Sequence, residues 1–396
     1  MDLLGLLRRA VELGASDIHL KTGRTPVIRC DGDLQVLEGW PALGDVDLEA
    51  ALAAVAPPHK VEAFHATGDL DLAYQAEALP RFRVNAFRQR GDLSLAFRVI
   101  PALVPSFASL GLPPGVERLA GESRGLVLVT GATGSGKTTT LAAIVDHVNQ
   151  TRRDHIVTIE DPIEIVHEDK GCVISQREVG LDTASFGEAL RRALRQDPDV
   201  ILIGELRDAE TAQIALQAAE SGHLVLSTLH TLDAAESCGR LIDFFPPEKQ
   251  QVIRSILAGV LRGVVSQRLL PRVGGGRVAA VEVMVTNVRI ADLIRDGRPD
   301  EITDAVAEGD FFQMQTFTQA LIDLALAGKV ERELAANAAT NRHDFLVALD
   351  RAEKQRNAEA RALAPEPIAP AAPAPVDAAA AAEEAAPTGL RLVPAE

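Results

Sequence analysis

Short apolar runs alternate with helical repeats through the middle of the chain and predict a parallel α/β sheet. The runs that we expect to be strands are residues 126–130, 156–160, 200–203 and 224–228. The stretches between them have helical spacing, and one of these stretches begins at a capping box formed by Ser185 and Glu188. Strands that alternate with helices pair in parallel through right-handed crossovers, so we expect an α/β core over about residues 117–285.

The first hundred residues have a different pattern, in which short strands alternate with helical segments. The strands expected there are residues 18–21, 27–31, 70–74, 82–88 and 93–99, separated by Gly or Pro. Residues 1–14 repeat Leu, Ala and Val with helical spacing, and we expect this helix to pack on its own domain rather than on a membrane. Residues 1–100 are therefore predicted to form a small α+β domain.

The remaining segments are assigned from composition. Residues 101–116 are rich in proline and predict a linker, which leads into a second, larger domain over residues 117–351. The pattern from residue 287 onward is helical, with an apolar stripe around Leu321. Residues 352–396 consist largely of Ala, Pro and Glu, which cannot bury enough apolar side chain to offset their ordering entropy, so we predict a disordered tail.

A complete phosphate-binding loop, Gly-Ala-Thr-Gly-Ser-Gly-Lys-Thr at residues 131–138, lies between the first core strand and the helix that follows. Glycines at 131, 134 and 136 allow the backbone N–H groups to point inward, and the helix N-terminus adds partial positive charge. Lys137 is expected to reach the β- and γ-phosphates, and Thr138 to offer its hydroxyl to Mg²⁺. The sequence thus predicts ATP and Mg²⁺ as cofactors. The expected nucleotide contacts are Gly131, Thr133, Gly134, Ser135, Gly136, Lys137, Thr138 and Thr139.

Acidic and histidine residues follow the other core strands. Glu160 and Glu164 come at the carboxyl end of the second strand, and Glu205 comes after the third. Open α/β sheets bind ligands at that end of their strands, so Glu205 is the first candidate for the carboxylate that orients the attacking water. His223 and His230 bracket the fourth strand, and either could sense the γ-phosphate.

The composition of the chain disfavours several other classes of protein. The formal charge of −16 disfavours a general nucleic-acid groove, which needs a concentrated basic face. The three cysteines stand far apart and form no C-x-x-C pair, which disfavours a disulfide framework and a structural zinc site. No apolar stretch approaches the roughly 18 to 20 residues that span a bilayer, so we expect a cytoplasmic protein without direct membrane insertion.

Four segments resemble the Walker A, Asp box, atypical Walker B and His box motifs of the secretion ATPase superfamily. They are residues 131–138, 158–164, 197–208 and 222–231. Further matches occur at residues 14–20, 81–90, 176–180 and 266–271. The likeness covers about residues 1–350, and within the superfamily the chain is most similar to the type IV pilus retraction ATPases.

The resemblance implies an architecture and a set of roles. It implies a hexameric ring, a homohexamer in which a PAS-like N-terminal domain and a RecA-like domain hold ATP between them. It also implies that Glu205 is the catalytic glutamate, Glu164 the Asp-box acid and His230 the His-box residue, and that Arg83 and Arg98 reach the phosphates. From the residues alone, an ordinary strand-face position is the better interpretation of both arginines. The implied partner is an integral platform protein of the inner membrane, at whose cytoplasmic face the motor would work.

Alternatives remain open. Residues 287–298 match the family's retraction-linked Ala-Ile-Arg motif only in part, which leaves an accessory retraction ATPase possible. Pilus assembly and type II secretion ATPases usually carry a further N-terminal domain and a four-cysteine insertion, and the absence of a cysteine pair favours the retraction branch. A protein of another class, which binds ATP as a gate for interactions without turning it over, is disfavoured by Glu205 and the two arginines.

Overall fold

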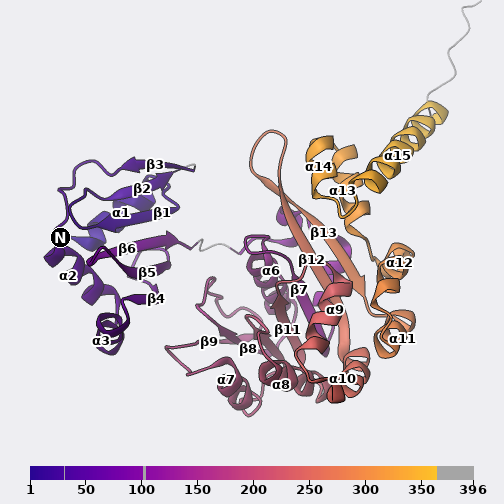
Figure 1. The fold of residues 1–396 in the computed structure, drawn as a ribbon, viewed down its shortest axis with the longest axis horizontal. Coiled ribbons are helices and arrows are strands. Elements are labelled where there is room, and N and C mark those ends of the chain that lie inside the picture. The colour runs from indigo at the N-terminus through magenta and orange to yellow at the C-terminus, as the bar shows by residue number, and fades with distance from the viewer. Residues whose placement is uncertain (31, 101–103, 364–396) are drawn as a thin grey trace, which may run out of the picture. The chain divides into compact units, whose positions relative to one another are not determined.

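The computed structural model describes residues 1–30, 32–100 and 104–363, with side chains up to residue 359. Residues 1–349 form one compact unit, and the described residues from Asp350 onward belong to a second. Two sheets organise the first unit, and Figure 1 shows the elements of each. The chain therefore has the mixed α/β fold that the strand and helix pattern predicts.

The N-terminal sheet is antiparallel, with the order β3-β2-β1-β6-β5-β4. Its strands are β1 (Asp17–Lys21), β2 (Val27–Cys30), β3 (Asp33–Val36), β4 (Asp69–Tyr74), β5 (Phe82–Gln89) and β6 (Asp92–Val99). The five predicted strands are confirmed, apart from Asp31, which lies outside the described residues. Strand β3 was not predicted. Its four residues, Asp-Leu-Gln-Val, alternate between polar and apolar, but all four are exposed, so this short alternation does not correspond to a buried face.

Three helices complete this domain: α1 (Leu3–Glu12), α2 (Asp45–Val55) and α3 (Pro58–Thr67). Helix α1 begins at Asp2, whose side chain accepts a hydrogen bond from the N–H of Gly5. Its apolar face is buried in the same core as the inner sides of β5 and β6. Helix α1 thus packs on its own domain, as its amphipathic pattern predicts.

The second sheet has the order β13-β12-β7-β11-β10-β8-β9. Its strands are β7 (Gly125–Thr130), β8 (His155–Glu160), β9 (Val173–Glu178), β10 (Val200–Ile203), β11 (Leu224–Leu229), β12 (Leu261–Pro271) and β13 (Arg277–Val285). All neighbours are parallel except β12 and β13, which form an antiparallel hairpin at one edge. The four predicted strands are confirmed as the parallel centre of this sheet.

Helices pack on this sheet and share one core with it. They are α6 (Lys137–Thr151), α7 (Phe186–Ala193), α8 (Ala209–Glu220), α9 (Ala234–Asp243) and α10 (Pro247–Val260). Helix α7 starts where the sequence predicts, because the Ser185 hydroxyl accepts a hydrogen bond from the N–H of Glu188. The four central strands are almost fully buried, which explains their continuous apolar runs.

The predicted linker over residues 101–116 is partly wrong. Residues 101–103 lie outside the described part of the chain, but α4 (Phe107–Leu110) and α5 (Pro114–Ala120) are helical. Val116 is fully buried in the core of the second sheet. Proline at the first turn of α5 is compatible with a helix start, so the prolines that indicated a linker also mark the beginning of the ATPase domain.

The C-terminal part is helical, as predicted. It contains α11 (Val288–Asp296), α12 (Ile302–Ala307), α13 (Phe317–Leu326), α14 (Arg332–Ala338) and α15 (Arg342–Leu363), with short 3₁₀ turns at Pro299–Glu301 and Asp310–Phe312. Residues 352–363 belong to α15, so the expected disordered tail does not begin at 352. Residues 364–396 lie outside the described residues. Among the helices described, none is long and apolar enough to cross a membrane.

Glu282 on β13 joins the sheet to helices on two sides. It is buried, and its carboxylate accepts hydrogen bonds from the N–H of Ala234 at the start of α9 and from the N–H of Phe317 at the start of α13. Burial raises the pKa of Glu282 to about 7, with a further rise from Asp233, while Arg268 and the two N–H groups oppose the shift. This carboxyl group therefore changes charge near neutral pH.

We expect the free energy of unfolding to fall as the pH rises because of Glu282. Its folded pKa of about 7 lies above its ordinary value of 4.5, so its contribution is present in acid and is lost as the pH passes through the folded pKa. Between about pH 5 and pH 8 this amounts to roughly 2 to 3 kcal/mol of unfolding free energy. Urea denaturation of the wild type and Glu282→Gln at both pH values measures it, with exposed Glu308→Gln as control. An equal pH dependence in all three proteins would contradict the expectation.

Candidate nucleotide-binding and catalytic site

The phosphate-binding loop adopts the curled backbone that its glycines predict. It connects Thr130 at the end of β7 to Lys137 at the start of α6. Gly131, Gly134 and Gly136 have φ angles of 142°, 79° and 94°. A side chain on Gly131 would also come within 2.5 Å of the backbone oxygen of Gln267 on β12. Gly131 is therefore required both for its backbone conformation and for its packing beside β12.

Lys137 lies across its own loop. Its Nζ donates to the carbonyl oxygens of Gly131 at 2.8 Å and Ala132 at 3.1 Å. Burial lowers the pKa of Lys137, while the carboxylates of Glu205 and Glu164 act in the opposite direction. The Lys137 ammonium group thus lies against the phosphate loop, close enough to Glu205 and Glu164 for their negative charges to stabilise it.

The loop hydroxyls differ in exposure. Thr133 and Thr138 are exposed, Thr139 is partly exposed, and Ser135 is buried with no hydrogen-bond partner for its Oγ in the described part of the chain. No cluster of three His, Cys, Asp or Glu that could hold a metal occurs among the described residues. A magnesium ion here fits Thr138 as one ligand, with phosphate oxygens and water as the others, which is the usual mode for nucleotide-bound Mg²⁺.

Glu205, His230 and Lys137 form one polar chain. Glu205 follows β10 and is largely buried, and its Oε1 lies 3.1 Å from Nε2 of His230. The Nδ1 of His230 lies 3.4 Å from Nζ of Lys137. Because the lysine can only donate, these partners assign the ring proton of a neutral His230 to Nε2, which then donates to Glu205. The second carboxylate oxygen accepts from Nε of Arg207 at 2.8 Å.

His223 lies away from these groups. It precedes β11, whereas His230 follows it, so the two imidazoles lie at opposite edges of the parallel strands. The Nδ1 of His223 contacts the carbonyl oxygen of Ala218 at 2.9 Å. It lines a cavity of about 540 Å³ at the amino ends of the strands. Of the two histidines left open by the sequence, the structure brings His230 to the phosphate loop.

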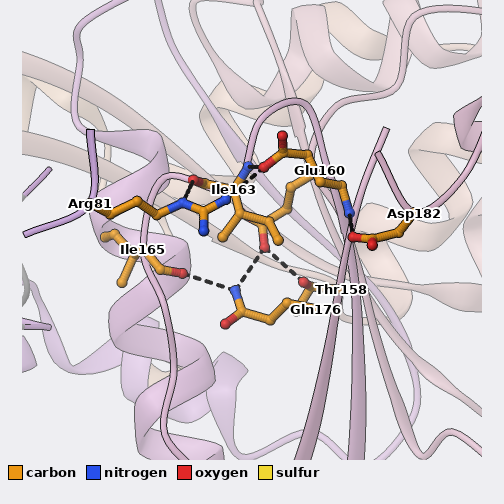
Figure 2. A network of polar contacts seen from close by, with 8 residues as sticks. Arg81, Thr158, Glu160, Ile163, Ile165, Gln176 and Asp182 are labelled. Carbon is orange, nitrogen blue, oxygen red and sulfur yellow. Dashed lines mark hydrogen bonds and ion pairs between the residues drawn. The ribbon is translucent and has the colours of Figure 1, made fainter. Parts of the chain in front are cut away.

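The Asp box forms a second polar group beside the loop. Glu160 accepts hydrogen bonds from the Thr158 hydroxyl at 2.7 Å and the Gln176 amide at 3.1 Å (Figure 2). Burial raises the pKa of Glu160, and these two hydrogen bonds oppose the rise. Glu164 is exposed over 41% of its side chain, and its negative charge acts to raise the pKa of both Lys137 and Glu160.

The two predicted arginines face each other across the β5–β6 ladder but have different partners. Arg83 and Arg98 are paired in register. Arg83 lies 3.8 Å from Glu164 of the Asp box and 3.9 Å from Asp71, both long contacts. Arg98 is bound to Asp17 at 2.9 Å. Arg83 is thus placed beside the candidate site, and no contact of Arg98 with the phosphate loop occurs among the described residues.

Arg81 is a functional candidate that sequence reasoning did not single out. Its Nη2 donates to Glu178 at 2.7 Å and its Nε donates to the carbonyl oxygen of Ile163 at 3.1 Å. Figure 2 shows Arg81 pointing toward Ile163 in the Asp-box segment. Glu178 at the end of β9 is 3% exposed and also accepts from the N–H of Ile163. Arg81 stands two residues before Arg83, but its partner is 97 residues away, so no local pattern indicates the pair.

Comparison with known proteins agrees with this geometry. The family model described as "Type II/IV secretion system protein" matches residues 3–281. The chain belongs to this family. It is 44% identical to the type IV pilus retraction ATPase PilT of Pseudomonas aeruginosa over 345 residues, which cover 87% of this chain and 100% of that protein. It is 39% identical to the type IV pilus ATPase PilU of the same organism, with 87% and 90% covered.

A solved structure is similar over the same range. The crystal structure of the pilus retraction motor PilT with bound ADP has a TM-score of 0.82 and 43% identity, and the match covers 87% of this chain and 98% of that one. This member of the secretion system family is therefore a P-loop ATPase, and a nucleotide is its ligand. The phosphate-binding loop predicted both conclusions.

We expect Arg81 and Arg83 to differ in their effect on stability. Arg81→Ala leaves the buried Glu178 carboxylate without its cation, which costs roughly 3 kcal/mol of unfolding free energy. Arg83→Ala removes only long, half-exposed contacts and is expected to cost less than about 1 kcal/mol. Urea denaturation followed by circular dichroism and by fluorescence of Trp40, the single tryptophan, compares the two variants. Equal midpoints would show that the Arg81 contact contributes no more than a surface pair.

Proposed function

We propose that this protein is an ATP-hydrolysing motor that powers the retraction of type IV pili. The observation that carries the proposal is the chain of Lys137, His230 and Glu205 at the mouth of the phosphate loop. It supports the proposal because an ammonium group that would hold the phosphates and a carboxylate that would orient water lie together at one edge of the sheet. The similarity to the retraction ATPase PilT over most of both chains supports pilus retraction rather than pilus assembly as the process that the motor drives.

The residues of the loop would bind and orient the triphosphate. The inward N–H groups and Lys137 hold the phosphate oxygens, and Thr138 holds Mg²⁺ through its hydroxyl, with Thr133, Ser135 and Thr139 completing the loop contacts. When bound, Mg²⁺ supplies neutralisation of the charge on the β- and γ-phosphates. Glu205 is placed to accept a proton from the attacking water, and His230 holds Glu205 on one side and approaches Lys137 on the other.

Closure of the N-terminal domain would complete the site. This domain, which we interpret as PAS-like, brings Arg83 beside Glu164. The long contacts of Arg83 leave its guanidinium free to exchange Glu164 for a phosphate oxygen, which also accepts charge-assisted hydrogen bonds from arginine. A positioned arginine can contribute roughly 10³ to 10⁵ in phosphoryl-transfer rate. Arg98 would take part after leaving Asp17, and the closing of the two domains would then control turnover.

The assembly that fits this role is a homohexamer in the cytoplasm, held at the inner face of the membrane by an integral platform protein. Pulling pilin subunits back into the membrane requires such a partner, because no helix among those described crosses a membrane. A second candidate is an accessory retraction ATPase, which the 39% identity to PilU supports. We propose no nucleic-acid partner.

The first test is the chemistry of Glu205. Glu205→Gln keeps the size of the side chain but replaces one acceptor oxygen with an NH2 donor and cannot accept the proton of water, so we expect phosphate release to fall by roughly 10² to 10⁴ while ATP binding persists. Steady-state phosphate release and nucleotide binding measure this, with Glu210→Gln, an exposed carboxylate on α8, as the matched control. If wild type and Glu205→Gln bound ATP and were equally slow, the protein would be an ATP gate rather than a motor.

The second test is cellular. Cells that lack the gene are expected to keep surface pili that no longer retract, and the wild-type gene but not Glu205→Gln should restore retraction. Fluorescence microscopy of labelled pili gives both readouts. Loss of surface pili in the deletion strain would identify an assembly motor instead, and retraction that persists with reduced force would identify an accessory one.

A further inference from the structure

Four buried hydroxyl groups lie directly behind the phosphate loop. They belong to Thr130 at the end of β7, Thr231 after β11, Ser237 on α9 and Ser266 on β12, and each is at most 3% exposed. Thr130 precedes the loop glycine Gly131, and Thr231 follows His230 in the chain. The hydroxyls therefore come from segments that flank both sides of the candidate site.

The four groups bond to one another across elements. Thr130 donates to Ser266 at 2.8 Å. The oxygens of Thr231 and Ser237 are 2.6 Å apart, and Ser237 lies 3.4 Å from Thr130. The single proton of Ser237 is directed to the carbonyl oxygen of Asp233 at 2.5 Å, so Thr231 must be the donor to Ser237. This gives the Thr231 hydroxyl one defined direction, toward α9.

His230 lies between the end of the sheet and Thr231 in the chain. The β7–β11 ladder ends with the pair Thr130 and Leu229, so His230 is the first residue beyond the sheet. Its side chain is 49% exposed and makes only the contacts to Glu205 and Lys137 described above among the residues described. Its backbone is thus held on one side by the last ladder pair and on the other by the hydroxyl of Thr231.

We propose that Thr231 and Ser237 are positioning residues for ATP hydrolysis, which hold His230 against Glu205 through the hydroxyl bond between them. The inference rests on the proposed function, because it assigns His230 a part in turnover. It goes beyond it by placing one determinant of His230 geometry, Ser237, on α9, outside the four family motifs, with Thr231 as the last residue of the His-box segment. Ser237 also lies 3.4 Å from Thr130, which precedes the phosphate loop, so the test must separate an effect that passes through His230 from one that passes through Thr130.

The test is a double-mutant cycle in the full-length protein. Ser237→Ala is expected to lower kcat by roughly 10- to 100-fold, since small displacements of catalytic groups have effects of that size, with little change in KM for ATP. The same substitution should change kcat less than about twofold when His230 is already Ala, because residues that act through one group are not additive. Thr231→Val should behave like Ser237→Ala, and Thr231→Ser, which keeps the hydroxyl, should retain wild-type kcat within about twofold.

The matched control is Ser227→Ala. Ser227 on β11 is as buried as Ser237 and also donates to a backbone carbonyl, that of Ile203 at 2.7 Å, but it has no bond to the hydroxyl chain. It therefore measures the general cost of losing a buried serine hydroxyl. Melting temperatures of both serine variants show whether either is simply unfolded, and Thr231→Val supplies a second route if Ser237→Ala is.

Three outcomes would overturn the inference. The first is a fall in kcat for Ser237→Ala no larger than that for Ser227→Ala. The second is an equal fall with and without the His230 side chain. The third is wild-type kcat in His230→Ala, which leaves nothing to position. In all three cases a slow Glu205→Gln variant would leave the proposed ATPase function standing, whereas a fast one would contradict that function itself.

Discussion

Parallel pairing of four strands is the constraint on which the site depends. β7, β11, β10 and β8 are neighbours in that order, and every pair is parallel. Their carboxyl ends consequently meet at one edge, and the segments that follow them are the phosphate loop, the His box, Glu205 and the Asp box. Residues that are up to 93 positions apart, such as Lys137 and His230, are brought into contact because each follows its strand.

Arg81, which directly precedes β5, and Arg83 within β5 show how burial separates a fixed contact from a movable one. Arg81 lies against a carboxylate that is 3% exposed and against the backbone of the Asp-box segment. Arg83 is 42% exposed and its ion pairs are 3.8 and 3.9 Å long. A buried, hydrogen-bonded pair costs much to break, whereas an exposed one costs little. Residues 81–83 therefore carry both an anchor to the ATPase domain and an arginine that is free to change partners.

Local patterns predicted the features that depend on neighbours in sequence. The central strands are continuous apolar runs, and the phosphate loop is a contiguous motif, so both were found. β9 and β12 carry polar residues such as Gln176 and Ser266, whose burial depends on partners far along the chain, and they were missed. The chain direction of β11 would have distinguished His230 from His223. In a parallel sheet, ligands bind at the carboxyl ends of the strands, and only His230 follows its strand. The Arg81 pair has no comparable signal.

Strand β12 connects the nucleotide edge to the C-terminal helices within three consecutive residues. Ser266 accepts from Thr130, and the backbone oxygen of Gln267 packs against Gly131. Arg268 stacks on the ring of Phe317 in α13 at 4.0 Å and donates to the carbonyl oxygen of Ala338 at the end of α14. Ser266 and Arg268 are two residues apart and therefore lie on the same face of the strand, so one short segment contacts both the start of the phosphate loop and the C-terminal helices. A displacement of the loop that moves β12 must therefore also move the base of those helices.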